Sequence, residues 1–261
     1  MVLATNTLVF DIETVPDAAF GARYFELDGL SPEDAVKAMA HLRQQQSGSD
    51  FQKLPFHQVV AISAVWRGRG DEIKVLSFGT PESDEAELIR QFFGAIDKYS
   101  PTLVSWNGSG FDLPVLHYRA MKHGIEAPRY WETGANDQSF RWNNYISRYH
   151  ERHTDLMDLL ALYNLRAAAR LDEVASLLGF PGKLGMDGSK VWDAWLAGEI
   201  VGIRDYCETD VLNTWLVYLA FERFRGNLQG SELEKEHQIL RDLLKSADKP
   251  HLQEFLSAWP A

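Results

Sequence analysis

The sequence predicts an α/β fold: a mixed β-sheet flanked by helices. Three observations lead to this expectation. Short β-prone runs come first, strands and helices then alternate, and helices close the chain. The length of 261 residues fits one elaborated domain or two small ones. With 45% apolar and 24% charged residues, the composition is that of a folded protein and excludes a mainly disordered chain.

Four segments have the β-branched and apolar composition that is typical of strands. In chain order they are 7–10, 59–66, 73–78 and 102–106. A glycine-rich turn at 67–71 joins the second and third runs as a hairpin. The segment between the first two runs is too long for a hairpin, and it contains a helix start at 31–34 and a polar run at 44–50. We therefore expect a helical insertion after the first strand, over about 17–56, with one helix and a flexible loop.

Apolar residues recur at helical spacing in six later segments. These predicted helices are 83–97, 113–123, 156–163, 171–178, 191–196 and 203–224. The remaining tail predicts one or two helices that pack on the outside. We expect a main domain over 1–225 and a C-terminal helical extension over 226–261.

Charge and cysteine content restrict the class of protein. The chain has 26 Lys and Arg against 37 Asp and Glu, a formal charge of −11, which argues against broad charge-driven binding to nucleic acid. The single cysteine, Cys207, excludes an internal disulfide and a cysteine-rich zinc site. No apolar run is long enough for a membrane span, and residues 1–10 lack a signal-peptide pattern. The expectation is a cytoplasmic protein with no signal peptide and no membrane partner.

Acidic residues occur at three positions where strands and helices are expected to meet. Asp11 and Glu13 follow the first apolar run, and side chains at i and i+2 of a strand share a face. Their repulsion would be costly without a cation. Asp112 follows a strand and a Gly-rich turn, so by itself it is read as a helix N-cap. Tyr206 and Asp210 share a helix face. Each feature alone also fits a solvated surface.

The three features together resemble a known set of motifs. Phe-Asp-Ile-Glu-Thr at 10–14, Asn-Gly-x-x-Phe-Asp at 107–112 and Tyr-Cys-x-x-Asp at 206–210 resemble the exonuclease motifs of the DEDD superfamily. The residues of these motifs are most similar to those of the proofreading 3′–5′ exonuclease domain of family-B DNA polymerases, and the resemblance extends over roughly residues 7–225. The resemblance implies a ribonuclease H-like fold. It also implies a stand-alone exonuclease, because the rest of the chain is too short for polymerase palm or fingers.

The resemblance also implies a metal site and a set of catalytic residues. The implied metal ligands are Asp11, Glu13, Asp112 and Asp210, and the implied cofactors are two divalent cations, Mg²⁺ or Mn²⁺. Hard cations prefer such oxygen ligands, and a pair of them can activate water and stabilise the leaving oxygen. Tyr206 would orient the attacking water and completes the catalytic set. Some members of the superfamily have a histidine five positions before the last aspartate, where this chain has Asp205.

Several further residues are candidates for contact with substrate. The implied substrate-binding residues are Thr14, Asn107, Phe111 and Lys183. Each has a plainer alternative: Asn107 could stabilise its turn, Phe111 could belong to the core, and Lys183 or Lys190 could lie in a solvated loop. Asp155 is either a helix N-cap or an additional acid near the metals. The aromatic residues between 130 and 145 either stack on bases or fill the core; they are Tyr130, Trp131, Phe140, Trp142 and Tyr145.

The expected function is removal of 5′-mononucleotides from the 3′ end of single-stranded DNA. The same chemistry on RNA, as in the ribonuclease D group, is the first alternative. The second is a non-catalytic nucleic-acid-binding or partner-binding module, which would be expected to lack a carboxylate or the tyrosine. Two bound divalent cations would reduce the formal charge from −11 to −7. The segment 141–170, with five Arg and three acids, is the best candidate for backbone contact.

Overall fold

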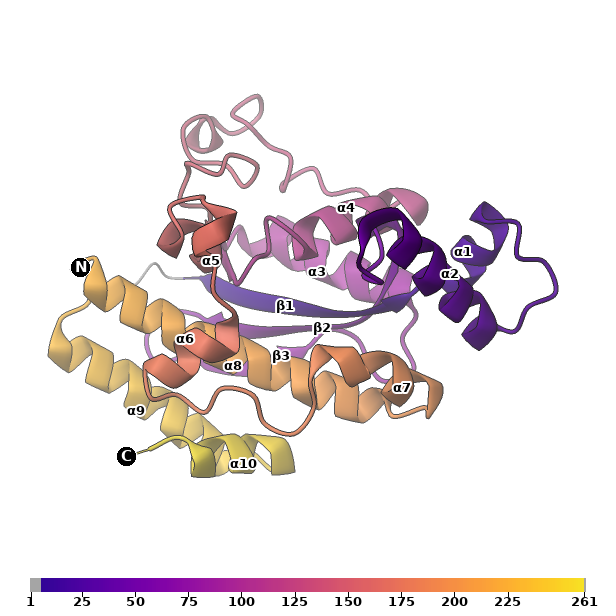
Figure 1. Cartoon of the computed structure of the whole chain (residues 1–261). Helices are drawn as coiled ribbons and strands as arrows, with labels where there is room; N and C mark the ends of the chain where they lie inside the picture. The colour runs from indigo at the N-terminus through magenta and orange to yellow at the C-terminus, as the bar shows by residue number, and fades with distance from the viewer. Residues whose placement is uncertain (1–5, 261) are drawn as a thin grey trace.

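The computed structural model describes residues 6–260 and is built on a five-stranded sheet with the order β3-β2-β1-β4-β5 (Figure 1). The strands are β1 (Thr7–Pro16), β2 (His57–Arg67), β3 (Ile73–Ser77), β4 (Thr102–Ser105) and β5 (His153–Asp155). Strand β1 is central; it is antiparallel to β2 and parallel to β4. This confirms the expected mixed sheet, in a ribonuclease H-like arrangement. The expectations for residues 1–5 and 261 lie outside the described residues.

Helices cover both faces of this sheet. They are α1 (Ala18–Tyr24), α2 (Pro32–Ser47), α3 (Glu85–Tyr99), α4 (Asp112–Lys122), α5 (Leu156–Leu160), α6 (Leu171–Leu177), α7 (Val191–Leu196), α8 (Ile200–Phe224), α9 (Gly230–Ser246) and α10 (Pro250–Ala258). Helices α3 and α4 lie on one side of the sheet, and the long α8 lies on the other (Figure 1). Within residues 6–260, no helix has both the length and the apolar character that a membrane span requires.

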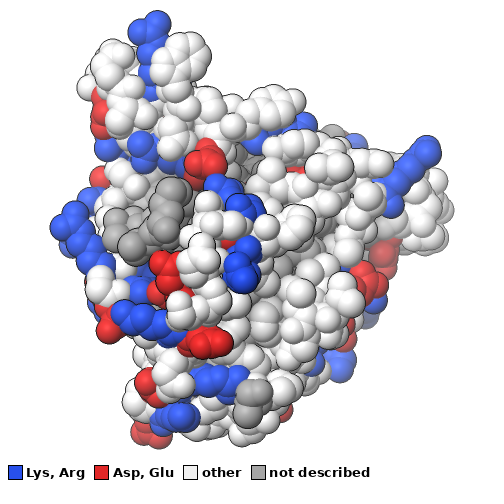
Figure 2. Space-filling model, turned by 90° about the vertical axis from the view of Figure 1, so that its left-hand side faces the viewer, with Lys and Arg blue, Asp and Glu red and all other residues white. Residues whose placement is uncertain are grey.

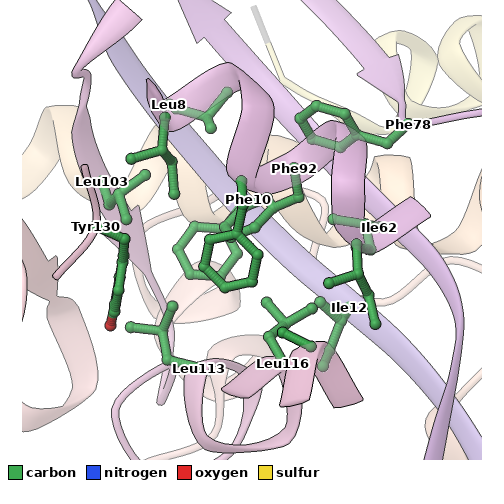
Figure 3. Close-up of a cluster of buried hydrophobic side chains, with 14 of the residues drawn as sticks. Leu8, Phe10, Ile12, Ile62, Phe78, Phe92, Leu103, Leu113, Leu116 and Tyr130 are labelled. Atoms are coloured by element: carbon green, nitrogen blue, oxygen red, sulfur yellow. The ribbon is translucent and has the colours of Figure 1, made fainter. Parts of the chain in front are cut away.

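The side-chain alternation of β1 divides the core into two layers. Leu8, Phe10 and Ile12 point toward α3 and α4, where they meet Phe92 and other apolar side chains (Figure 3). Val9 belongs to the cluster on the opposite face, which Trp215 of α8 dominates. Asp11 and Glu13 lie two and four residues after Val9, so their side chains are on the same face of the strand as that of Val9. The strand therefore directs both carboxylates toward the α8 side of the sheet.

The two tail helices belong to the α8 layer of the core. Leu240, Leu244 and Phe255 are buried in the same cluster as Val9 and Trp215. A buried ion pair also joins α9 to the sheet: Arg67 donates to both carboxylate oxygens of Glu236, each at 2.8 Å. The expectation of one or two helices in the tail is confirmed, and these helices cover apolar surface that α8 alone would leave exposed.

Four expectations about the elements are wrong. Strand β1 continues to Pro16 because β2 pairs with its whole length, so Asp11 and Glu13 lie within the strand and not at its end. The insertion contains two helices, α1 and α2, and a 3₁₀ turn at Leu54–Phe56, instead of one helix and a flexible loop. Strand β5 was not expected. Finally, the helix expected over 156–163 ends at Leu160.

A buried ion cluster fixes the insertion to the rest of the fold. Arg119 of α4 is 2% exposed and donates to Asp17 at 2.7 Å, directly before α1. The same guanidinium donates to both oxygens of Glu85 at the start of α3, at 2.7 and 2.6 Å. Glu85 also accepts the backbone N–H of Val59 in β2 at 2.7 Å. One cation thus joins four elements around the central sheet.

Replacement of this cation is expected to destabilise the fold strongly. In Arg119→Met, Asp17 and Glu85 would lose their shared buried cation and keep only the more exposed Lys122 and His123 as side-chain partners, so the free energy of unfolding should fall by about 3–5 kcal/mol. Urea unfolding followed by circular dichroism measures this loss. Arg90→Met is the matched control, because Arg90 pairs with Glu87 at 2.8 Å on the exposed side of α3. The control should lose less than about 1 kcal/mol. Equal losses in the two variants would contradict the assignment.

Candidate active site

The first two carboxylates of the site come from β1. Glu13 is 8% exposed and Asp11 is partly exposed. Carboxylate oxygens of both residues and the sulfur of Cys207 in α8 lie within 4.8 Å of one another. The Cys207 sulfur is 3.5 Å from the backbone oxygen of Asp11. The face that β1 turns toward α8 therefore collects two acids and a buried thiol in one place.

The third carboxylate reaches this place from the N-terminus of α4. Asp112 is the first residue of the helix, and Phe111 occupies the N-cap position without a side-chain cap bond. The expectation that Asp112 is the N-cap is therefore wrong. Its oxygen Oδ1 instead accepts the backbone N–H of Ile12 at 3.2 Å. Since Ile12 lies between Asp11 and Glu13, this bond fixes the third acid beside the first two.

The fourth carboxylate and the tyrosine come from one face of α8. Tyr206 is 6% exposed, and Asp210 lies one turn later on the same helix face, close enough for its charge to raise the pKa of the phenol. Burial and the nearby acids raise the pKa of Tyr206 far above its ordinary value. The phenol therefore keeps its proton at neutral pH. It can orient a water molecule but does not act as a base.

The four acids destabilise one another in their charged forms. Burial is the main cause that raises the pKa of Asp11 well above its usual range, and repulsion from Asp112, Glu13 and Asp210 adds to it. The pKa of Glu13 is raised in the same way. Burial also raises the pKa of Asp112 to about 7 and that of Asp210 to about 6. Full ionisation of the cluster at neutral pH is therefore unfavourable without added positive charge, which is the condition that a bound cation relieves.

The loop between β4 and α4 is fixed by Asp155. Its two carboxylate oxygens accept the backbone N–H groups of Asn107 at 2.9 Å and Ser109 at 2.8 Å. Asp155 also accepts the N–H of Asp158 at 3.3 Å, so its predicted role as an N-cap is confirmed. Gly108 has no room for a side chain, because a Cβ there would lie 2.2 Å from the Ser105 hydroxyl. The loop that carries Asn107 and leads to Asp112 is therefore tightly constrained.

A second loop places Lys183 above the acids. Its positive charge partly offsets the rise in the pKa values of Glu13 and Asp210, which means that Lys183 lies close to both. Asn213 of α8 holds the preceding residue at two points, since its amide donates to the Gly182 carbonyl at 2.8 Å and accepts the Gly182 N–H at 3.0 Å. Asp172 accepts the N–H of Lys183 at 2.8 Å. Sequence reasoning missed Asn213, although its position three residues after Asp210 places it on the same helix face.

These residues line a cleft of about 350 Å³. Its walls include the predicted residues Asp11, Asn107, Phe111, Asp112, Lys183, Tyr206 and Asp210, together with Arg170, Asp172 and Asn213. Glu13 is buried beside Asp11. Thr14 is oriented differently: its hydroxyl bonds the Nδ1 atom of His57 at 2.9 Å, and Thr14 is not part of the cleft wall.

The remaining candidates divide between core and surface. Phe111 packs edge-on against His57, with ring centroids 5.1 Å apart, while part of it reaches the cleft. Tyr130, Phe140 and Tyr145 are at most 2% exposed and belong to the core. Trp131 and Trp142 are 53% and 79% exposed. Lys190 is exposed at the end of a short 3₁₀ turn.

Comparisons with known proteins identify the family. Residues 49–259 match the model of a family described as "Predicted 3'-5' exonuclease related to the exonuclease domain of PolB". Since this match covers most of the chain, the protein belongs to that family. No curated protein matches the sequence.

Among the 54 similar chains of solved structures is the family B DNA polymerase from the hyperthermophilic archaeon Pyrobaculum calidifontis. The sequence identity is 18% and the TM-score is 0.47. The match covers 97% of this chain and 27% of the polymerase.

The raised pKa of Asp112 predicts an unusual dependence of stability on pH. Because the folded-state pKa of about 7 lies above the ordinary value of 3.8, its contribution to stability is largest at low pH and is lost as the pH rises toward 8. Asp112→Asn removes this charge and keeps an acceptor for the Ile12 N–H. In EDTA the variant should melt about 5 °C higher than the parent protein at pH 8 and at the same temperature at pH 4.

The exposed Glu254→Gln is the control for this experiment and should change neither melting temperature. Addition of Mn²⁺ at pH 8 should stabilise the parent protein more than Asp112→Asn. A variant that melts below the parent protein at pH 8 in EDTA would show that Asp112 is not under electrostatic stress.

Proposed function

We propose that this protein is a metal-dependent 3′–5′ exonuclease that acts on single-stranded DNA and releases 5′-mononucleotides. The observation that carries the proposal is the convergence of Asp11, Glu13, Asp112 and Asp210 from three elements, with Tyr206 beside them. Structural acids are normally paired with cations or hydrogen-bond donors, whereas here the charges of Asp112 and Asp210 raise the pKa values of Asp11 and Glu13.

The donor set fits two divalent cations, Mg²⁺ or Mn²⁺. It consists of carboxylate oxygens, which hard cations prefer, and the adjoining cleft has room for water and for a phosphate group. When bound, the cations supply positive charge to the attacking and leaving oxygens of the phosphodiester bond. Asp11, Glu13, Asp112 and Asp210 would hold them. The thiol of Cys207 is protonated, since burial raises its pKa well above the ordinary value.

The other residues of the cleft bind and orient substrate in this proposal. Tyr206 holds the attacking water by a hydrogen bond. Lys183 contacts a phosphate oxygen, and Asn107 contacts the terminal nucleotide from the loop that Asp155 fixes. A cleft of about 350 Å³ suits one nucleotide and not a duplex. The formal charge of −11 also opposes tight binding of duplex DNA, so a single-stranded end is the favoured substrate.

The central test is degradation of oligonucleotides labelled at either end. With Mg²⁺ or Mn²⁺, 5′-labelled single-stranded DNA should shorten stepwise, while 3′-labelled DNA should release the label as a mononucleotide at once. EDTA should abolish both reactions. Asp210→Asn should be inactive although it folds, whereas Glu173→Gln, an exposed acid on α6, should retain full activity. Parallel RNA substrates decide between the two nucleic acids. Activity that survives EDTA, or an intact substrate under all conditions, would refute the proposal.

The role of Lys183 can be tested separately. Lys183→Met should raise KM about 10-fold, which is the effect of losing one hydrogen bond to a charged phosphate, and should leave kcat nearly unchanged. Lys190→Met is the matched control, because Lys190 is exposed nearby and not part of the cleft wall. If both substitutions change KM equally, the effect is one of general charge and the assignment of Lys183 is wrong.

A further inference from the structure

A second cavity, of about 600 Å³, adjoins the carboxylate cleft. Asn107 lines both of them, and Ser109 and Gly110 of the same loop line the second. The opposite wall comes from the segment between α4 and β5, which projects as irregular loops at the top of Figure 1. A chain that leaves the cleft across the Asn107 loop therefore enters this second cavity directly.

The wall of the second cavity contains an aromatic ring that is held in place but still exposed. Trp131 is 53% exposed, and its ring contacts His117 at 5.1 Å and Tyr130 at 5.4 Å between centroids. These contacts fix the indole, so stacking on it would cost little conformational entropy. Tyr130 itself is stacked on the buried Tyr145, with an angle of 7° between the rings. The platform under Trp131 is thus part of the core.

The opposite rim combines a cation with a second ring. The guanidinium of Arg148 lies 4.4 Å from the centre of the Tyr163 ring, and the Tyr163 hydroxyl donates to the Arg148 carbonyl at 3.0 Å. Tyr163 and Leu162 both have positive φ angles, 60° and 51°, which are strained for side chains of this size. The strained turn places Leu165, 80% exposed, on the cavity wall.

A polar atom of the wall also lacks a partner. Within residues 6–260, the buried Nε2 atom of His117 has no hydrogen-bond partner. Burial lowers the pKa of His117 to about 4, so the ring is neutral.

Only a few cationic residues line the cleft and the second cavity. Lys183 and Arg170 line the cleft, and Arg148 lines the second cavity, where its guanidinium also pairs with Asp158 at 3.3 Å. On the face shown in Figure 2, Lys and Arg side chains alternate with Asp and Glu, and no large area of one sign stands out. A nucleic acid held here would depend on a few placed cations and on stacking, and not on a broad electrostatic field.

We propose that this cavity binds the bases that precede the terminal nucleotide of a single strand, with Trp131 as the stacking platform and Arg148 close to the backbone. The proposal rests on the proposed function, because that function places the 3′ end in the adjoining cleft. The single strand is favoured over other occupants because cavity and cleft are continuous at Asn107, and because exposed rings and a cation occur together in the cavity wall.

The test compares a short and a long substrate, 5′-fluorescein-labelled dT2 and dT8. Trp131→Ala should raise KM for dT8 about 10-fold, as expected for the loss of one base–aromatic contact, should raise KM for dT2, which has a single preceding base, less, and should leave both kcat values unchanged. Trp142→Ala, on the same segment and 79% exposed, should change nothing. Leu165→Asp is a second variant that cannot disturb the core, and it should weaken dT8 selectively through charge repulsion.

Binding measured by fluorescence anisotropy in EDTA separates this proposal from the proposed function. If no substrate is hydrolysed but Trp131→Ala and Leu165→Asp still weaken dT8 binding, the exonuclease assignment fails and the base-binding cavity stands. If hydrolysis occurs but dT2 and dT8 are affected equally, or neither is affected, the cavity does not bind upstream bases. That result would overturn the proposal and would favour a protein partner for this surface.

Discussion

Mutual repulsion of four clustered acids is the constraint on which the rest of the structure depends. Asp11 and Glu13 come from the central strand, Asp112 from the start of α4 and Asp210 from α8, so the fold must keep three elements together against their own charges. The apolar clusters on the two faces of the sheet supply the packing that keeps these elements together, and the acids lie next to them. The acids themselves contribute few of the bonds that hold this region, apart from the bond between Asp112 and Ile12.

Two acids on α8 differ in their partners and therefore in the direction of their pKa shifts. Glu208 is 2% exposed, and burial alone would raise its pKa; hydrogen bonds from His251 and Lys249 of the tail hold that pKa below its ordinary value instead. Ser77 of β3 donates to it as well, at 2.9 Å. Asp210, two residues later, faces the other acids, and its pKa is raised to about 6. The chain supplies cations to buried acids elsewhere, and their scarcity around Asp210 is consistent with the cation site that we propose.

The contacts of Glu208 also connect the C-terminal helices to the helix that carries two residues of the site. Lys249 and His251 fix Glu208 from one side of α8, while Asn213 holds the Lys183 loop on another. The helix that carries Tyr206 and Asp210 is therefore anchored by segments far away in the sequence. We expect the position of Asp210 relative to β1 to depend on the tail, although no tail residue reaches the cleft wall among residues 6–260.

Sequence patterns predicted those parts of the molecule that depend on local periodicity. The alternation in β1 placed Asp11 and Glu13 on one face, and the four-residue spacing placed Tyr206 next to Asp210. Features that depend on tertiary contacts escaped prediction. Strand β5 has three residues and exists because β4 pairs with it, and α1 has only seven residues and packs its aromatic side chains against the buried Phe56. Thr14 belongs to the first motif, but a register shift between Glu13 and Thr14 and the bond to His57 direct its hydroxyl elsewhere.

The structure shows where the acids behind the net charge of −11 lie, and this limits what the charge implies about nucleic-acid binding. Four of the acids form the cleft, and others are consumed in ion pairs such as Asp17 with Arg119 and Glu236 with Arg67. The cations near the cleft and the second cavity, Lys183 and Arg148, are single residues fixed by backbone bonds or ring contacts. A duplex would meet mixed charge over most of this surface and gain little from it. The single-stranded end that we propose as substrate would place one phosphate at the cations of the site and its bases on exposed rings, and such binding does not depend on a broad positive surface.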